Sequence, residues 1–336
     1  MAKVCVLGAG SWGTALAVHL ARKEGNEVFL CSMTDKDFEK ISKDRENTSA
    51  LPGVKIPENV KINHDIEESI KASDMIVLAV ASLYVRETSA KISSFVKEGQ
   101  IIVEVAKGIE EDSLKMLYEV IEDEIPQANV AILSGPTHAE EVGREIPTTC
   151  VVGAKDKETA EYIREVFMTD SLRVYINPDM LGIALGGALK NVIALAAGIA
   201  DGLGYGDNSK AALITRGMSE IMRLGVKMGA EESTFAGLSG MGDLIVTCES
   251  RHSRNRRAGF LIGEGMTPQE AMTEVDMVVE GVYAARSAKR LAKEHGEELP
   301  IVNEVVKVLF ENKDPGEAVK DLMLRDTVLE VRSQDY

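Results

Sequence analysis

The stretch KVCVLGAGSWGTALAVHLARK, residues 3–23, decides how the first half of the chain folds. Its first residues, 3–7, are a short apolar run that is typical of a buried strand. The glycine pattern GAGSWG follows at 8–13, and residues 14–23 then carry apolar side chains at helical spacing. Strand, glycine turn and helix in this order indicate the first unit of an α/β sheet.

Each glycine of this turn has a separate physical reason. Gly8 makes the tight turn, Gly10 lets the backbone approach a pyrophosphate, and Gly13 lets the helix pack closely on the strand. The free N–H groups at the helix start then face the anion. The pattern therefore predicts a dinucleotide-binding site at the beginning of the chain.

The end of the second expected strand, 27–31, bears on which dinucleotide is bound. A carboxylate there would bind a ribose 2′-hydroxyl, and an arginine would accommodate a 2′-phosphate. The residues that follow are Ser32, Met33, Thr34, Asp35 and Lys36. Neither a well-placed acid nor an arginine is present, so the sequence leaves the choice between NAD and NADP open.

The rest of the chain divides into two halves by its pattern. Further strand-like runs lie at 75–80, 100–105, 129–133 and 149–153, with helical stretches between them. Alternation of this kind predicts a mostly parallel sheet covered on both faces. Helical patterns alone follow, at 181–200, 209–229, 253–264, 267–275, 280–295, 300–312 and 315–323. We expect an α/β, Rossmann-like dinucleotide-binding domain over 1–180, followed by an all-α substrate domain over 181–336.

Composition narrows the class of protein. The chain has 336 residues and a net charge of −16, which disfavours nucleic acid and anionic membranes as general partners. Its four cysteines are scattered, with no CxxC pair and no histidine at ligand spacing, which argues against structural zinc and for a reducing compartment. The chain starts without a basic leader and apolar core, so we expect no secretory signal and a cytoplasmic location.

The helix expected at 181–200 raises a question of its own. Its length would allow a membrane span, but its Gly and Ala content favours a buried helix without membrane insertion. Lys190 and Asn191 stand in its middle, in the stretch GGALKNVIALAAG at 186–198. A lysine in such surroundings must reach water, find a partner or lose its proton. The alternative is a lysine near the helix start whose ammonium escapes to solvent.

Two other segments carry candidate groups. Lys107, in EVAKGIE at 104–110, follows a strand-like run and could hold an anionic substrate, unless it is a solvated loop lysine. The segment 237–259, GLSGMGDLIVTCESRHSRNRRAG, offers donors for a phosphate at Thr247, Ser253, Arg254 and Asn255. Asp243 in this segment could pair with a lysine, or could cap a helix that starts near Leu244. The arginines could alternatively pair with nearby acids on the surface.

Several blocks together resemble one enzyme family. They are GAGSWGTALA, AKGIE, SGPTHAEEV, GALKNVIALAAGIADGLGYGDNSKAALITRG, GLSGMGDLIVTC, SRNRRAG and VVEGV, which occur in family order across the chain. In these blocks the chain is similar to the bacterial type of NAD(P)-dependent glycerol-3-phosphate dehydrogenase. The resemblance implies reversible hydride transfer between dihydroxyacetone phosphate and sn-glycerol 3-phosphate, a precursor of glycerophospholipids. It is compatible with a homodimer, and the sequence leaves the oligomeric state open.

The resemblance also assigns roles to individual residues. It makes Lys190 the proton donor and acceptor, with Lys107, Asp243 and Thr247 as further catalytic groups. The substrate contacts that it implies are Lys107, Gly135, Thr137, Lys190, Asn191, Asp243, Ser253, Arg254 and Asn255. The cofactor contacts are Gly8, Gly10, Ser11, Trp12, Gly13, Met33, Lys107, Ala139, Arg254, Val278 and Glu280. No metal is implied.

Two rival interpretations differ from this one in their predicted sites. A related β-hydroxyacid dehydrogenase would share the layout and a catalytic lysine, but it would not need the phosphate-binding segment SRNRR. A non-catalytic NAD(P)-binding regulator would keep GAGSWG, but it would not need Lys107, Lys190, Asp243 and Arg254 together.

Overall fold

The first half of the chain forms one eight-stranded sheet. The computed structural model describes residues 2–275 and 277–326. The strands are β1 (Lys3–Leu7), β2 (Glu27–Cys31), β3 (Val60–Asn63), β4 (Met75–Leu78), β5 (Ile101–Glu104), β6 (Asn129–Ser134), β7 (Thr148–Ala154) and β8 (Leu172–Ile176). Their order is β3-β2-β1-β4-β5-β6-β7-β8, and all neighbours are parallel except β6 and β7. The expected α/β class and the mostly parallel sheet are confirmed.

Helices cover both faces of this sheet. The larger ones in the α/β half are α1 (Ser11–Arg22), α2 (Asp35–Asp44), α3 (Ile66–Ala72), α4 (Val85–Ile92), α5 (Leu117–Glu124), α6 (Ala139–Val142) and α7 (Lys157–Phe167). Apolar residues of α1 and α7 share one buried cluster with the sheet, and those of α3, α4 and α5 share another. Because both faces are buried, the central strands are continuous apolar runs, which is why the sequence reveals them.

The two strands that the sequence did not predict are the two edges of the sheet. In β3, VKIN, and β8, LRVYI, polar residues alternate with apolar ones, and each strand is bonded on one side only. Short, half-polar strands give a weak pattern, because only one of their faces is buried. The antiparallel direction of β7 was also not predicted from the sequence.

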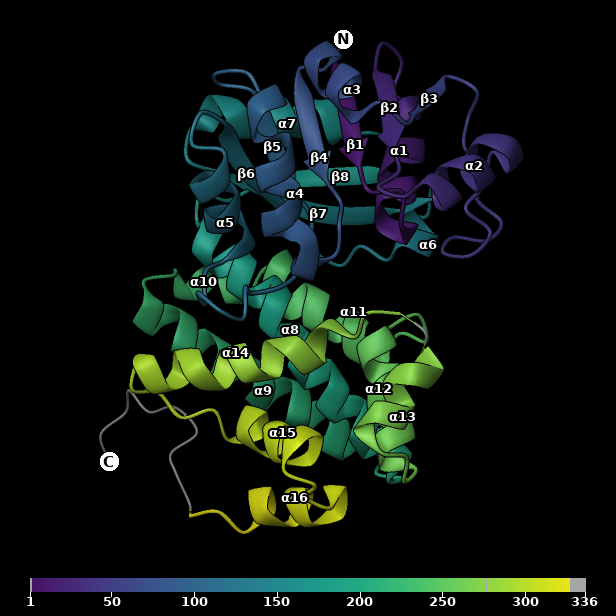
Figure 1. Cartoon of the computed structure of the whole chain (residues 1–336). Coiled ribbons are helices and arrows are strands. Elements are labelled where there is room, and N and C mark those ends of the chain that lie inside the picture. Colours follow the sequence, from purple (N-terminus) through teal and green to yellow (C-terminus); the bar gives the residue numbers. More distant parts are fainter. Residues whose placement is uncertain (1, 276, 327–336) are drawn as a thin grey trace.

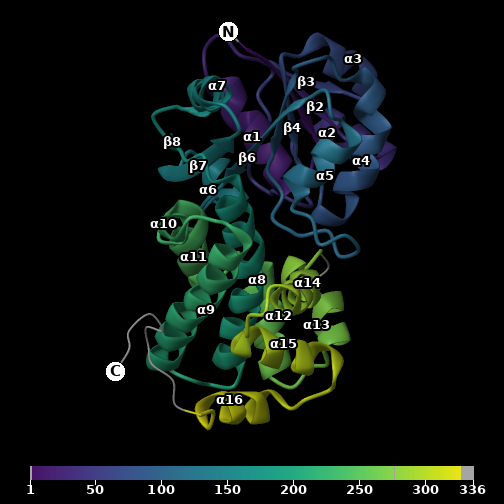
Figure 2. The ribbon, with the colours of Figure 1, turned by 90° about the vertical axis from the view of Figure 1, so that its left-hand side faces the viewer.

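The second half is helical throughout the part that the structure describes. Its helices are α8 (Met180–Gly202), α9 (Asp207–Met228), α10 (Glu232–Phe235), α11 (Asp243–Glu249), α12 (Arg254–Gly263), α13 (Pro268–Val275), α14 (Glu280–Glu294), α15 (Pro300–Phe310) and α16 (Pro315–Met323). They lie below the α/β half in Figure 1, with α16 farthest from the sheet in both views (Figures 1 and 2). The seven expected helices are confirmed, whereas the short α10 and a π-helical turn at Leu238–Gly242 were not predicted.

Helix α8 is the centre of the helical half. It is long and apolar enough to span a membrane by composition, and 94% of its most apolar window is buried inside the protein. Helix α12 packs against it at very short range, because glycines face each other at the crossing. A Cβ on Gly198 would lie 2.0 Å from the carbonyl oxygen of Arg256, and one on Gly259 would lie 2.0 Å from that of Leu195. This close packing brings the start of α12 beside the middle of α8.

Candidate active site

A cavity of about 390 Å³ lies where the α/β half meets the helical half. The loops after β1, β4 and β5 line it from the sheet, and these strands are neighbours in the order β1-β4-β5. The strand order reverses at β1 and β4, and ligands of open α/β sheets bind at such a point. Residues of α8, α11, α12 and α14 close it from the other side.

The glycine turn has the geometry that a dinucleotide requires. Gly8 has a φ of +105°, and a Cβ on it would lie 2.6 Å from the carbonyl oxygen of Ala79. A Cβ on Gly13 would collide with the carbonyl of Gly8, whereas Gly10 faces open space and lines the cavity. No side chain caps the N-terminus of α1, so its N–H groups remain available to an anion. These features fit a pyrophosphate beside Ser11 and Trp12, which also line the cavity.

Two lysines share one carboxylate in the wall of this cavity. The Nζ of Lys190 lies 2.7 Å from Oδ1 of Asp243 and 2.5 Å from the hydroxyl of Thr247. The Nζ of Lys107 lies 2.7 Å from the other oxygen, Oδ2 of Asp243. Asp243 and Thr247 are one turn apart on α11, so both face α8. The structure therefore brings together the four residues proposed as catalytic, which lie far apart in the sequence.

Burial controls the charge state of this cluster. Lys190 is 5% exposed and Asp243 is 1% exposed. Burial lowers the pKa of Lys190 to about 8, with Lys107 adding to the effect and Asp243 opposing it. Burial opposes ionisation of Asp243, but the two ammonium groups outweigh it and hold the pKa of this carboxyl below its usual range. The alternative of a lysine that escapes to water is therefore wrong, because Lys190 lies in the middle of α8 and is enclosed.

The interpretation of Asp243 as a helix cap is also wrong. Asp243 is the first residue of α11 itself, Gly242 occupies the cap position, and no side chain caps this helix. The carboxylate instead serves the two lysines. The side chain of Thr247 donates to the backbone carbonyl of Asp243 at 2.6 Å, which leaves its oxygen to accept from Lys190.

The loop after strand β6 supplies the support for Lys107. The Nζ of Lys107 donates to the carbonyl oxygen of Gly135 at 2.9 Å and lies 3.5 Å from the hydroxyl of Thr137. Gly135 has a φ of +138°, and a Cβ there would come within 3.0 Å of Cys150. Gly135 thus orients Lys107 through its backbone, and it is not among the residues that line the cavity.

The start of α12 presents polar groups to the same cavity. Ser253 caps this helix by accepting from the N–H of Arg256, and Arg254 follows at the cavity wall. The amide of Asn255 donates to the side-chain oxygen of Asn191 at 3.0 Å and accepts from the N–H of Gly281 at 2.8 Å. Asn255 therefore joins α12 to α8 and α14, and it orients Asn191 toward the cavity.

The three arginines at the start of α12, Arg254, Arg256 and Arg257, separate into two groups. Arg254 lines the cavity, whereas Arg256 bonds Asp201 at 2.6 Å and Arg257 lies 3.7 Å from Glu274. The expectation that surface arginines pair with acids is thus correct for the last two residues only.

The remaining expected cofactor contacts divide between the cavity and the core. Ala139, Val278 and Glu280 line the cavity. Glu280 accepts from the hydroxyl of Ser82, and burial raises its pKa above the usual range. Met33 does not line the cavity; it packs against the buried cluster under α3 and α4.

Comparison with known proteins identifies the family. The family described as "NAD-dependent glycerol-3-phosphate dehydrogenase N-terminus" matches residues 3–160, and its C-terminal counterpart matches residues 179–320. The chain belongs to the NAD-dependent glycerol-3-phosphate dehydrogenase family.

Individual relatives of this family match over the full length. The chain is 55% identical over 336 residues to a glycerol-3-phosphate dehydrogenase [NAD(P)+] of Agathobacter rectalis, with 100% of both chains covered. It is 54% identical to a protein of that name from Fusobacterium nucleatum, with 99% of this chain and 100% of the relative covered. The crystal structure of glycerol-3-phosphate dehydrogenase from Coxiella burnetii has a TM-score of 0.92 at 36% identity, covering 96% and 99% of the two chains.

Three polar residues of this chain that were not predicted from the sequence also line the cavity. They are His138 and Glu140 from the start of α6, and His252 from the loop before α12. The signal that could have found His138 is its place in SGPTHAEEV, directly after β6 and next to Thr137. His252 lies in the segment 237–259, directly before the predicted phosphate donors Ser253, Arg254 and Asn255.

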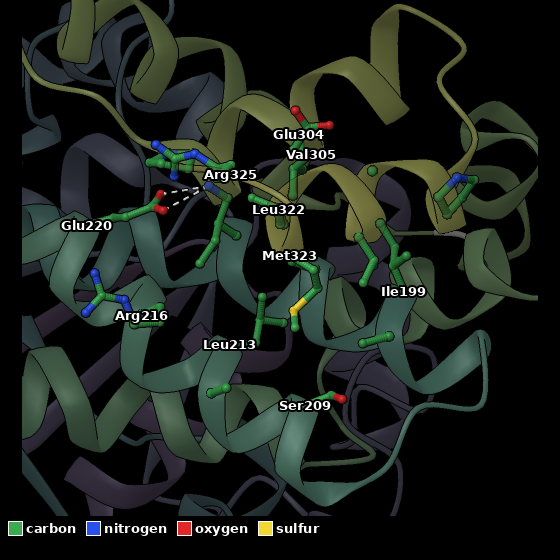
Figure 3. A pocket seen from close by; sticks show the side chains of 18 of the residues that line it. Ile199, Ser209, Leu213, Arg216, Glu220, Glu304, Val305, Leu322, Met323 and Arg325 are labelled. Atoms are coloured by element: carbon green, nitrogen blue, oxygen red, sulfur yellow. Dashed lines mark hydrogen bonds between the residues drawn. The ribbon is translucent and has the colours of Figure 1, made fainter. Parts of the chain in front are cut away.

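A second cavity, of about 360 Å³, lies among α8, α9, α15 and α16 (Figure 3). Apolar side chains such as Ile199, Leu213 and Val305 line much of it. The carboxylate of Glu220 is engaged with the N-terminus of α15, where it accepts from the N–H of Ile301 at 2.9 Å, as the dashed lines in Figure 3 show. None of the residues expected to bind cofactor or substrate lines this cavity.

Proposed function

We propose that the chain acts as an NAD(P)-dependent glycerol-3-phosphate dehydrogenase in which Lys190 is the proton donor and acceptor. The observation that carries this proposal is the buried Lys190–Asp243–Lys107 cluster in the wall of the cavity. Burial is the main cause that lowers the pKa of Lys190 to about 8, so both protonation states of this lysine are accessible near neutral pH. A catalytic group with such a pKa transfers protons efficiently in both directions.

On this proposal two lysines act through their protons and charge, and Asp243 and Thr247 hold them in position. In the reducing direction the Lys190 ammonium gives a proton to the oxygen at C2 of the substrate, and in oxidation the neutral amine takes it back. The Lys107 ammonium adds positive charge where an alkoxide develops, and this stabilises the transition state. Asp243 holds both nitrogens in place, and Thr247 orients Lys190. The nicotinamide, when bound, supplies or accepts the hydride.

The cofactor would lie along the glycine turn, with the pyrophosphate at the N-terminus of α1. Gly10, Ser11 and Trp12 would contact it from the sheet, with Ala139, Val278 and Glu280 completing its site. The substrate phosphate would be bound by Arg254, whose planar guanidinium matches phosphate oxygens. Asn191, positioned by Asn255, would donate its free amide hydrogens to the substrate, and Ser253 would add its hydroxyl.

On this proposal the division of the chain at about residue 180 has a functional meaning. The unit 1–180 would bind the dinucleotide, and the unit 181–336 would supply Lys190, Asp243 and the phosphate contacts. The product, sn-glycerol 3-phosphate, would serve glycerophospholipid biosynthesis.

The experiment that tests the function follows absorbance of the reduced nicotinamide with dihydroxyacetone phosphate, using NADH and NADPH side by side. The proposal expects oxidation of at least one cofactor, strictly dependent on the phosphorylated ketone, and the ratio of rates decides the preference that Ser32 and Met33 leave open. Absence of turnover from folded protein that still binds cofactor would contradict it.

A further inference from the structure

His138 lines the active-site cavity, and one of its ring nitrogens has no hydrogen-bond partner in the protein. Its Nε2 is fully buried and makes no hydrogen bond. The residue occupies the cap position of α6, directly after Thr137, and it lines the same cavity as Lys190 and Lys107. A buried polar atom without a partner destabilises the folded protein. Such an atom in a residue that lines the cavity therefore points to a function there.

A second imidazole links His138 to the surface. The ring centroids of His138 and His252 are 6.0 Å apart, and Nδ1 of His252 lies 3.9 Å from Oε1 of Glu140. The side chains of His252 and Glu140 are 32% and 28% exposed, whereas that of Lys190 is 6% exposed. The three residues thus form a row of proton-carrying groups that begins in the buried wall and ends at solvent.

We propose that His138, His252 and Glu140 form a proton path between Lys190 and solvent. The proposal rests on the proposed role of Lys190, because the path has a purpose only if that lysine changes its protonation state in each cycle. Bound cofactor and substrate would fill the cavity and shield Lys190 from water. A route through side chains would then let the lysine recover its proton while the site stays occupied.

The proton transfers balance over one reduction. The N–H bond of the Lys190 ammonium breaks as the O–H bond of the product forms, and a neutral amine remains. A protonated His252 then passes its N–H proton to the neutral His138 through one bridging water, and the imidazolium so formed gives its N–H proton to that amine and becomes neutral again. Solvent reprotonates His252 beside the Glu140 carboxylate, and oxidation runs the same steps in reverse.

The charged groups around His138 favour an imidazole that holds an added proton only briefly. Lys190 from α8 and Lys107 after β5 face it as cations, and Asp243 from α11 and Glu140 from α6 face it as anions. Burial, followed by the two ammonium groups, lowers the pKa of His138 below its usual range. The imidazole is therefore neutral at rest, and it loses an added proton readily to the amine that forms when Lys190 discharges.

The first test is His138→Ala with added imidazole, in steady-state reduction of dihydroxyacetone phosphate. We expect kcat to fall about tenfold, below the range of direct acid–base catalysis, with KM little changed. The solvent deuterium isotope effect on kcat should rise, and free imidazole should restore much of the rate. His295→Ala, the same change at an exposed histidine outside the cavity, serves as control and should leave kcat unchanged.

His138→Gln separates proton transfer from positioning. Glutamine can form hydrogen bonds but cannot carry a proton at neutral pH, so it should remain as slow as alanine and lack the response to imidazole seen with His138→Ala. A Gln variant with the original kcat and isotope effect would overturn the proposal and assign His138 a positioning role. A rise in KM alone, without recovery by imidazole, would likewise overturn it in favour of a substrate contact.

A measurement that does not depend on turnover completes the test. We expect NMR titration of the His138 ring to give a higher pKa in Lys190→Met than in the original protein, because the cation that lowers it is removed. An unchanged pKa would contradict the coupling. Turnover retained by Lys190→Met would refute the proposed function itself, whereas a silent Lys190→Met with a fully active His138→Ala would refute only the proton path.

Discussion

Asp243 and Asp201 each lie between two cations, and the contrast between the two clusters shows what makes a site. Asp243 bonds Lys190 and Lys107, and its side chain is 2% exposed. Asp201 bonds Lys210 at 2.8 Å and Arg256 at 2.6 Å, and its side chain is 12% exposed. Only the first cluster opens into the cavity at the sheet edge. A carboxylate shared by two cations is therefore a structural feature in itself. Such a cluster can take part in a reaction only where a substrate can reach its lysine.

The largest expected difference between the clusters is in turnover. Lys190→Met should lower kcat by about 10³-fold or more, because the proposed proton donor and acceptor is lost. Cofactor affinity, measured by fluorescence titration, should change little. The matched change Lys210→Met should leave kcat within about twofold. Equal losses from both lysines would mean that the cavity confers no special role.

The second largest effect on turnover is expected from the comparison of the two aspartates, Asp243 and Asp201. Asp243→Asn removes the counterion of two lysines, and we expect kcat to fall about 10²-fold, since Lys190 and Lys107 lose their alignment. The pKa of Lys190 should fall further, because Asp243 raises it in the native protein. The alkaline limb of the reduction rate should therefore move to lower pH. Asp201→Asn provides the control, and a limb that stayed in place in Asp243→Asn would contradict this account.

The two arginines of α12 offer a third comparison. Arg254→Ala should raise the KM for dihydroxyacetone phosphate by about 10–100-fold with a smaller change in kcat, because a charge-assisted bond to phosphate contributes about 1.5–3 kcal/mol. Arg256→Ala should leave KM unchanged and affect only thermal stability. Initial-rate kinetics of both variants decide the matter. The reverse pattern would place the phosphate site at Arg256.

The smallest effect on activity is expected from the second cavity. Burial raises the pKa of Glu220 from the 4.5 of an ordinary glutamate to about 7. The unfolded chain releases this proton at lower pH than the folded protein, so the native protein loses stability as pH rises through this window. Glu220→Gln should remove this loss, on the order of 3 kcal/mol between pH 4.5 and 7, with kcat unchanged.

Chemical denaturation of the original protein and of Glu220→Gln at several pH values would show that difference. A stability difference that did not vary with pH would contradict the assignment of the ionisation to Glu220. A loss of turnover in the variant would show that the second cavity takes part in the reaction.

Sequence patterns predicted those parts of the fold that are buried on both sides. The central strands and the long amphipathic helices have strong periodicity, and GAGSWG specifies its turn through steric requirements that the structure shows at Gly8 and Gly13. The edge strands β3 and β8 were not predicted, because only part of their residues is buried and the apolar pattern is weak. Strand β7 was predicted at 149–153, but its antiparallel direction was not, because direction within a sheet leaves no local pattern.

The candidate site was predictable only where a residue looked out of place. Lys190 could be predicted because it stands in an apolar helix, and Arg254 could be predicted because it stands in a basic run within an acidic chain. The sharing of Asp243 between two lysines depends on how α11 packs against α8 and on where β5 ends, and no local pattern contains that information. His138 was not predicted, although it stands next to Thr137 in SGPTHAEEV, because a single histidine after a strand has no local pattern that separates a catalytic role from a structural one.

The most direct test of the role of Lys190 is the pH dependence of kcat in both directions. Reduction needs the ammonium and oxidation needs the amine, so the reduction rate should fall and the oxidation rate should rise through one apparent pKa near 8. Both limbs should be absent from the residual activity of Lys190→Met. Limbs of the same sign in the two directions, or limbs that persist in Lys190→Met, would contradict the assignment of proton transfer to this lysine.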